Sequence, residues 1–431
     1  MKRLGFSAAL ILLLCGFALG QGQFKVLYTF NGTDGQGPQS LIFDQAGNLY
    51  GTTFIGGGCA LCGTLFELSP RTDGGWTETV LHNFCSLPSC QDGQGPNRGL
   101  VFDRKGNLYG TTFVGGQFGG GTVFELSPSS GGSWTETVLY NFCASLISCS
   151  TGIAPRGDLV FDSSGNLFGT TDEGGVSCVA APNGCGTVFE LSPPSSQGGQ
   201  WTETTLYSFC STGQGKTCPD GLFPSGGVVM DSEGNLFGAT QWGGLYSSVC
   251  DVGCGTIYKL SHGSGGWTQS LVLAPVWTVG YEPLGPLTVD KEGRIYGSLF
   301  QGGKNHDGSL FRLNPNGKGV DFFFDYLDGA VPEGRLMLSN DVLYGSTYSG
   351  GSVNNNGVVF MMTSPDQEAV LYNFCSELNC ADGSNPVGMT EDSSGNIFGT
   401  TLQGGNESCV YSDAGCGVVY EITAPEEFSK R

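Results

Sequence analysis

The chain has 431 residues, of which 13% are charged, 11% are aromatic and 74 are glycine. Aromatic residues at this level exclude a disordered chain, and glycine without a period of three excludes a collagen-like one. The formal net charge of −21 argues against nucleic acid as a partner, because a polyanion would be repelled. This composition is typical of many short strands joined by tight turns.

Residues 1–20 are predicted to be a signal peptide. Lys2 and Arg3 precede an apolar run over 4–14 that is too short to span a bilayer, and small residues at 18 and 20 fit a cleavage site. Cleavage would leave a net charge of −23, because two basic residues are removed. We therefore expect an exported protein, secreted or held in the periplasm or at the cell surface, without a membrane span. After the signal peptide, the sequence predicts a single domain over 21–423 and a short polar tail over 424–431.

Seven copies of one repeat fill the predicted domain. Six carry a stretch such as DQAGNLYGTT from Asp44 or DSSGNLFGTT from Asp162, and a shortened copy, NDVLYGST, begins at Asn340. A Gly-Gly pair follows every copy at the same offset. The glycine after the aromatic residue marks the repeats at Gly51, Gly110, Gly169, Gly238, Gly297, Gly345 and Gly399. Marks spaced by 48 to 69 residues indicate a repeat architecture.

Each repeat predicts four antiparallel strands, as the second repeat shows. GLVFD over 99–103 is continuously apolar and fits an innermost strand that is covered on both faces. Asp-x-x-Gly then makes a tight turn into NLYGTT from 107, and GTVFELSP from 121 and WTETVLYNF from 134 supply two more strands. Four strands per repeat are typical of a propeller blade. The sequence therefore predicts an all-β, seven-bladed β-propeller of four-stranded antiparallel blades.

The two ends of the domain predict how the ring closes. The last repeat ends with its third strand, GVVYEI over 417–422, and has no fourth. An orphan strand, FKVLYTF over 24–30, resembles the fourth strand of the sixth repeat, AVLYNF over 369–374. Pairing 24–30 with 417–422 would complete the seventh blade and leave no bare sheet edge. The alternative, an open solenoid, would need polar capping units that the sequence does not show.

Sixteen cysteines beyond Cys15 form eight close pairs. They are Cys59/Cys62, Cys85/Cys90, Cys143/Cys149, Cys178/Cys185, Cys210/Cys218, Cys250/Cys254, Cys375/Cys380 and Cys409/Cys416. All lie in loops after the second or the fourth strand of a repeat. Such loops emerge on one face of a propeller, which we call the cysteine face, and the Asp-x-x-Gly turns lie on the opposite turn face. Local disulfides are predicted, since the chain is exported and the count is even.

Redox and zinc chemistry are the weaker interpretations of these cysteines. The CxxC motif at 59–62 does not open a helix, where thiolates are activated. A four-cysteine zinc site needs two pairs to converge, and repeats that radiate outward are expected to keep their pairs apart. The histidines His82, His262 and His306 lie far apart around the predicted ring, so no catalytic triad or histidine–metal site is predicted.

Five repeats carry an aspartate before the first strand, where it would ring the mouth of the central channel. These residues are Asp34, Asp92, Asp220, Asp328 and Asp382. One interpretation is a cation site, with calcium as a possible ligand, or the paired carboxylates of a glycosidase. The other is a turn in which each aspartate caps its own backbone. Recurrence in five repeats favours the turn, because active sites rarely repeat with the symmetry.

Broken symmetry predicts a ligand site in the fourth and fifth repeats. Aromatic, acidic and histidine side chains appear there in neighbouring loops of the cysteine face. The candidate site residues are Trp242, Tyr246, Trp277, Tyr281, Glu282, His306 and Asp307. Exposed aromatic rings beside a few polar groups suit sugar stacking or a protein anchor. The alternative is that these rings merely pack against one another.

The repeated GNLYGTT…GG…GTVFEL unit resembles the tandem repeats of the bacterial GloVer-containing secreted proteins. That resemblance implies an exported bacterial protein and no particular activity. The favoured hypothesis is a monomeric, non-catalytic binding or adhesion module for an extracellular glycan or protein. The alternative is a secreted polysaccharide-active enzyme, a hydrolase or lyase, that uses acidic residues at the channel mouth. No catalytic residues and no metal site are predicted.

Overall fold

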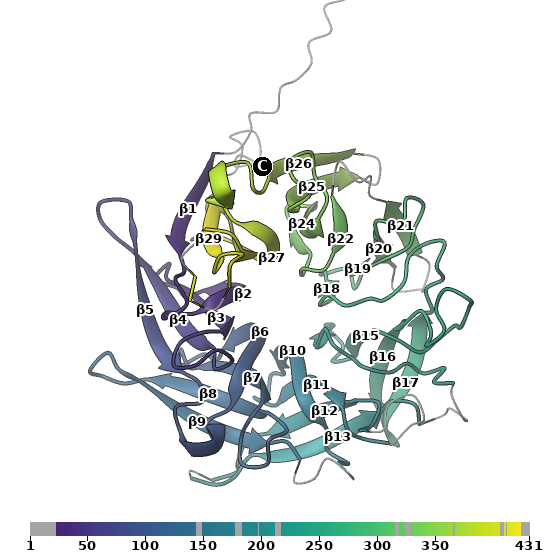
Figure 1. Ribbon diagram of the computed structural model, residues 1–431. Helices are drawn as coiled ribbons and strands as arrows, with labels where there is room; N and C mark the ends of the chain where they lie inside the picture. The colour runs from purple at the N-terminus through teal and green to yellow at the C-terminus, as the bar shows by residue number, and fades with distance from the viewer. Residues whose placement is uncertain are drawn as a thin grey trace, which may run out of the picture.

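The computed structural model describes residues 23–423, except 144–148, 177–182, 197, 212–216, 315–318, 324–328, 365–366, 406–408 and 411. Seven antiparallel sheets stand around a central opening as the blades of a propeller (Figure 1). The predicted all-β, seven-bladed fold is confirmed. The predicted signal peptide and polar tail lie outside the described residues. No helix in the described part of the chain is long and apolar enough to cross a membrane.

Each blade runs from an innermost strand at the channel to an outermost strand at the rim. Blade 1 holds β2 (Gln36–Phe43), β3 (Leu49–Ile55), β4 (Thr64–Pro70) and β5 (Trp76–Asn83). Blade 2 holds β6 (Gln94–Phe102), β7 (Leu108–Val114), β8 (Thr122–Pro128) and β9 (Trp134–Asn141). Blade 3 holds β10 (Ile153–Phe161), β11 (Leu167–Glu173), β12 (Thr187–Ser192) and β13 (Thr202–Ser208). Blade 4 holds β14 (Val228–Met230), β15 (Leu236–Thr240), β16 (Thr256–Gly263) and β17 (Gly266–Leu273).

The remaining blades follow the same order. Blade 5 holds β18 (Thr288–Val289), β19 (Ile295–Leu299), β20 (Ser309–Leu313) and β21 (Gly319–Phe323). Blade 6 has an interrupted inner strand, β22 (Ala330–Pro332) and β23 (Met337–Ser339), then β24 (Val342–Ser349), β25 (Val358–Ser364) and β26 (Gln367–Asn373). Blade 7 holds β27 (Ser384–Glu391), β28 (Ile397–Gln403), β29 (Val418–Ile422) and β1 (Phe24–Thr29). Two short 3-10 helices, η1 (Pro88–Cys90) and η2 (Leu378–Cys380), lie in loops of the cysteine face.

The ring closes as the sequence predicts. β1, from the start of the domain, pairs antiparallel with β29, from its end, and Phe24 lies opposite Ile422 (Figure 1). The backbone N–H of Phe30 continues the pairing by donating to the carbonyl of Gly417 at 3.1 Å. The seventh blade therefore takes its outermost strand from the other end of the domain.

The glycine of each GNLYGTT stretch lies under an aromatic ring. A Cβ atom at Gly51 would come within 2.6 Å of Phe66 in β4 and 2.9 Å of Leu41 in β2. The equivalent glycines of the other blades face Phe124, Phe189, Tyr258, Phe311, Phe360 and Tyr420 in the same way. A side chain at this position would expel the ring that reaches from the third strand toward the innermost one. The repeated glycine is therefore a packing requirement.

Neighbouring blades are joined by a recurring seam. Between blades 1 and 2, the N–H of Gly95 donates to the carbonyl of Cys62 at 2.9 Å, and the ring of Pro96 lies against Gly63. A Cβ atom at Gly63 would come within 2.5 Å of that ring. The same donor, just before a proline, recurs at Gly37, Gly95, Ala154, Phe223, Glu282, Val331 and Asn385, with distances of 2.7 to 3.0 Å. Every blade interface, including the closure of blade 7 on blade 1, is thus built alike.

Seven of the eight predicted disulfides join the expected neighbours. They are Cys59–Cys62, Cys85–Cys90, Cys143–Cys149, Cys210–Cys218, Cys250–Cys254, Cys375–Cys380 and Cys409–Cys416. In the eighth pair Cys185 is disulfide-bonded, and Cys178 lies outside the described residues. This disulfide content indicates an extracellular or otherwise oxidising compartment.

The seam predicts a specific sensitivity at Gly63. Gly63→Ala should lower the free energy of unfolding by about 2 kcal/mol, because the new methyl group meets Pro96 and the backbone carbonyl of Thr53. Gly74→Ala is the matched control: both glycines have φ near +80°, but nothing lies within 4 Å of a Cβ atom at Gly74. Thermal unfolding of the two variants separates packing from backbone strain. Equal losses of stability would show that the seam contributes nothing beyond the backbone conformation.

Candidate functional site in the central channel

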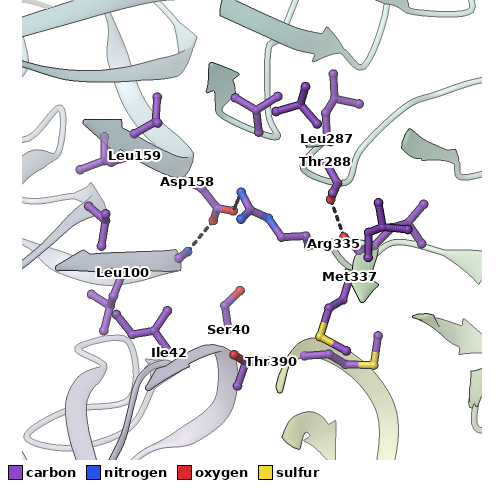
Figure 2. Close-up of a pocket in the computed structure, with 18 of the residues that line it drawn as sticks. Ser40, Ile42, Leu100, Asp158, Leu159, Leu287, Thr288, Arg335, Met337 and Thr390 are labelled. Carbon is purple, nitrogen blue, oxygen red and sulfur yellow. Dashed lines mark hydrogen bonds and ion pairs between the residues drawn. The ribbon is translucent and has the colours of Figure 1, made fainter. Parts of the chain in front are cut away.

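Two ion pairs cross the channel between blades that are distant in the sequence. Arg98 of β6 meets Glu333 at 3.3 Å, and Arg335 meets Asp158 of β10 at 2.6 Å, as Figure 2 shows for the second pair. Asp158 also accepts a hydrogen bond from the N–H of Gly99 at 2.8 Å. We call the four charged side chains the neck, because they link blades 2 and 3 to blade 6 across the opening.

The neck divides the channel into two unequal parts. On the turn-face side lies a cavity of about 550 Å³, lined by the innermost strands of all seven blades. Its lining is mostly apolar, with residues such as Leu100, Leu159 and Met337 (Figure 2). On the cysteine-face side a crevice of about 50 Å³ lies beside Arg98 and Glu333. This second part, which we call the mouth, brings charged groups to the face that carries the long loops.

A third ion pair lies within blade 3, near enough to Arg98 for the charge of that arginine to act on it. Arg156 of β10 meets Asp172 of β11 at 3.0 Å. The side chain of Asp172 is only 14% exposed, and its Oδ1 atom is buried without a hydrogen-bond partner. Burial raises the pKa of Asp172 to about 6, although the guanidinium groups of Arg156 and Arg98 lower it. A largely buried carboxyl group with a pKa near neutrality suits general acid–base chemistry.

A sequence comparison of the repeats could have revealed Asp172, but only through the strand positions and not through the loops. Asp172 is the third residue after the glycine that marks its repeat. At this position the other blades carry Phe54, Phe113, Gln241, Phe300, Tyr348 and Leu402. A carboxylate in this one copy breaks the symmetry as clearly as the loop aromatics do. Differences between the loops alone do not reveal Asp172, because it lies within β11.

The aspartates that recur before the innermost strands serve their own loops. Asp34 accepts hydrogen bonds from the Tyr28 hydroxyl at 2.6 Å and from the N–H of Asn31 at 2.9 Å. Asp92 and Asp382 accept from the N–H and hydroxyl groups of Ser86 and Ser376 in the same way. Asp220 accepts from Tyr207 and Ser211, and Asp328 lies outside the described residues. This geometry is that of a capped turn, the interpretation that the sequence favours over a cation site.

The predicted aromatic site forms two neighbouring groups. In blade 4, the ring of Trp242 packs edge-on against Phe223 at 5.3 Å between centroids, and the Tyr246 hydroxyl accepts the N–H of Cys218 at 2.7 Å. Glu282 lies beside Trp242: burial raises the pKa of Glu282 and the Trp242 side chain lowers it. Trp242 and Tyr246 are therefore tied into the loops that carry them.

The second group lies in blade 5 and is more open. Trp277 is 42% exposed, and its ring runs parallel to that of His306 at 6.5 Å between centroids. The Tyr281 hydroxyl donates to Gln301 at 2.7 Å, and the carbonyl of Asp307 accepts the seam hydrogen bond from Val331. Because Tyr281 and Glu282 are adjacent, the two groups meet there. Trp277 and His306 are both exposed and are therefore the rings of this set that lie open to a ligand.

Two cysteine loops converge within a single blade, a case that the expected separation of different repeats does not cover. The sulfur atoms of Cys59, Cys62 and Cys85 lie within 4.8 Å of one another, and so do those of Cys185, Cys210 and Cys218. Both sets occur in blades whose second and fourth strands are each followed by a cysteine pair. All six cysteines are disulfide-bonded, so the sulfur atoms are not available as thiolate ligands.

Further carboxyl groups with raised pKa values lie between blades, away from the channel. Burial and the nearby charge of Asp92 raise the pKa of Glu136 to about 8, and its Oε1 atom is buried without a hydrogen-bond partner. Burial and Asp34 raise the pKa of Glu78 to about 7. His82 contacts Asp92 at 3.5 Å, and burial lowers the pKa of this histidine. None of these groups lines the cavity or the crevice of the channel, so we relate them to stability.

The fold and channel define a closed, disulfide-bonded repeat propeller with a charged neck. The family described as the Gloeobacter/Verrucomicrobia repeat matches residues 15–249, 148–354 and 224–430, and the chain belongs to this family. The resemblance stated from the repeat motif is thereby confirmed. No curated protein matches the chain.

Solved structures resemble the chain at low identity. A gluconolactonase from Xanthomonas campestris is 14% identical with a TM-score of 0.43, over 77% of this chain and 88% of that one. An assigned 6-phosphogluconolactonase from Bacteroides fragilis is 13% identical with a TM-score of 0.47, over 77% and 82%. An assigned glucose dehydrogenase from Thermus thermophilus is 13% identical with a TM-score of 0.43, over 93% and 99%.

These comparisons correct the favoured hypothesis of a non-catalytic binding module. The three similar propellers are described as enzymes, and that hypothesis is not retained. At such identities the likeness concerns the arrangement of blades and identifies no reaction or substrate.

Glu136 predicts a pH-dependent stability that one substitution should remove. The folded-state pKa of Glu136 lies above the ordinary value of 4.5, so between these two pH values folded chains keep a proton that unfolded chains release. Stability therefore falls as the pH rises from about 4.5 to about 8. Glu136→Gln should leave the melting temperature unchanged near pH 4 and raise it by about 2 °C or more at pH 8.5. The exposed Glu377→Gln serves as the control. An unchanged pH dependence in Glu136→Gln would contradict the raised pKa.

Proposed function

We propose that this protein is an exported enzyme that hydrolyses glycosidic bonds at the mouth of the central channel. The observation that carries the proposal is that one guanidinium group, that of Arg98, links the two carboxyl groups: it pairs with Glu333 at 3.3 Å, and its charge acts on Asp172, whose pKa is about 6. Hydrolysis of glycosides commonly uses two carboxyl groups on either side of the bond, one of them with a raised pKa.

The two carboxyl groups fit different roles. Asp172 would donate the proton to the leaving oxygen, because its raised pKa keeps much of it protonated near pH 6. Glu333 would act on the sugar carbon, directly or through a water molecule, with Arg98 fixing its orientation at 3.3 Å. Arg156 holds Asp172 in place at 3.0 Å and moderates its pKa. The guanidinium groups of the two arginines can donate hydrogen bonds to sugar hydroxyl groups, and the two carboxylates can accept hydrogen bonds from them.

The walls of the mouth support a carbohydrate substrate. Phe54, Phe113, Phe300 and Tyr348 occupy the Asp172 position in their own blades and are all partly exposed. The Arg156 guanidinium lies 5.6 Å from the centre of the Phe113 ring, so one of these aromatic rings directly adjoins the charged groups. Aromatic faces beside hydrogen-bonding groups are suited to sugar rings.

The neck limits the form of the substrate. Asp158 and Arg335 form an ion pair across the channel below the mouth, where it would obstruct a glycan that threaded through (Figure 2). We therefore propose action on chain ends or small glycosides. The candidate residues Trp242, Tyr246, Trp277, Tyr281, Glu282, His306 and Asp307 would contact the rest of an extracellular glycan on the same face. A monomer suffices, since all of these residues belong to one chain.

Asp172→Asn tests the acid role. The substitution should lower kcat/KM on 4-nitrophenyl glycosides by about a hundredfold or more, since it removes the transferable proton and keeps the shape. In the unsubstituted protein kcat/KM should fall as the pH rises above about 6, because Asp172 then loses its proton. That limb of the pH profile should disappear in the variant.

The adjacent Glu173→Gln is the matched control for this experiment. Glu173 accepts a hydrogen bond from Asn183 at 3.1 Å and raises the pKa of Asp172 only through its charge, so activity should persist while the limb of the pH profile moves to a lower pH. Circular dichroism and thermal unfolding confirm that the variants fold. Failure of a broad panel of α- and β-glycosides to release 4-nitrophenol, or an active Asp172→Asn variant, would overturn the proposed function.

A further inference from the structure

Exposed large apolar side chains gather on one face of the propeller. Thirteen such residues stand out among the described residues, and twelve of them lie in loops or strand ends of the cysteine face. These twelve are Leu61, Leu87, Val114, Phe118, Val176, Leu245, Val249, Val252, Val276, Trp277, Leu378 and Val410. The exception is Leu271, within β17 at the outer edge of blade 4. Singly scattered apolar residues are ordinary, but their restriction to one face is not.

Disulfides hold several of these side chains outward. Leu61, Leu87, Val252, Leu378 and Val410 each lie inside a loop that a bridge closes. Five of the seven described bridges therefore enclose an exposed leucine or valine, and Leu378 is 85% exposed. A closed loop loses little conformational freedom on binding, so these tips are preorganised for contact. They would not fold inward to hide their apolar surface.

The geometry and chemistry point to a lipid surface. The tips come from several blades and all lie on one side of a flat ring, which matches a planar partner and not a single pocket. Most are aliphatic: Trp277 and Phe118 are the two aromatic members, so sugar stacking does not account for the set. Aliphatic side chains gain free energy by entering the boundary between headgroups and acyl chains.

Charge selects among the possible partners. With a net charge of −21, the chain would be repelled by an anionic membrane and by a second copy approaching face to face. A zwitterionic surface carries no net charge and imposes no such penalty. We propose that the cysteine face docks on a lipid surface with neutral headgroups, with the disulfide-closed loops as its contact points. This docking is independent of the proposed hydrolase activity.

Vesicle sedimentation tests the docking with a matched control. The disulfide-bonded protein should co-sediment with phosphatidylcholine vesicles, and addition of phosphatidylglycerol should weaken binding. Combined Leu61→Ser, Leu87→Ser and Leu378→Ser should lower the partition coefficient roughly a thousandfold, at roughly tenfold per leucine. Leu271→Ser, which removes a side chain that is 49% exposed away from this face, should bind as the unsubstituted protein does.

Each other result counts against the proposal. No binding to phosphatidylcholine, or equal binding by the triple variant, would overturn it. Equal loss in Leu271→Ser would show that binding is not specific to the face, and stronger binding to anionic vesicles would refute the choice of headgroup. Sedimentation velocity checks for a second copy: a dimer that the triple variant abolishes would assign the face to self-association instead. Because no glycoside is present, none of these results depends on catalytic activity.

Discussion

The propeller depends on the contact between a glycine of one blade and a proline of the next. At all seven interfaces a proline ring lies where a Cβ atom on the glycine would come within 2.4 to 2.7 Å of it. The residue before the proline donates its N–H to the preceding blade. One seam thus joins the loop before the third strand of one blade to the start of the innermost strand of the next. Because Gly417 and Pro38 repeat it, the last interface is of the same kind as the other six.

This seam also explains a strained backbone around the mouth. Ala154, Phe223, Glu282, Val331 and Asn385 all have φ between 56° and 61°, in the left-handed region that non-glycine residues avoid. Each of these residues precedes a proline, and the proline ring further restricts the backbone conformations open to the residue before it. The conformation aims the N–H at the neighbouring blade. It also brings the Glu282 side chain beside Trp242, so the strained backbone contributes to the predicted aromatic site of blades 4 and 5, which we call the aromatic patch.

The sequence predicted the fold because each blade repeats its requirements. Gly51 and its six equivalents are needed under aromatic rings, and the orphan strand at 24–30 had one free edge to pair with. The neck was beyond such reasoning. Arg98 and Glu333 are 235 residues apart, and their meeting depends on which side chains face each other across the channel. A repeat motif specifies contacts within and between adjacent blades, and it contains no information about pairs across the ring.

The two faces of the propeller divide its chemistry. On the turn face, Asp44 and its equivalents accept hydrogen bonds from backbone N–H groups two and four residues on, and these short turns leave little side chain to present. The cysteine face holds the mouth, the aromatic patch and the apolar tips. Lipid docking and catalysis at the mouth would therefore share one surface. A docked propeller would hold Asp172 close to the lipid headgroups. A soluble glycan would then have to pass between the loops to reach Asp172. A sugar attached to a lipid of the same surface would already lie in front of the mouth.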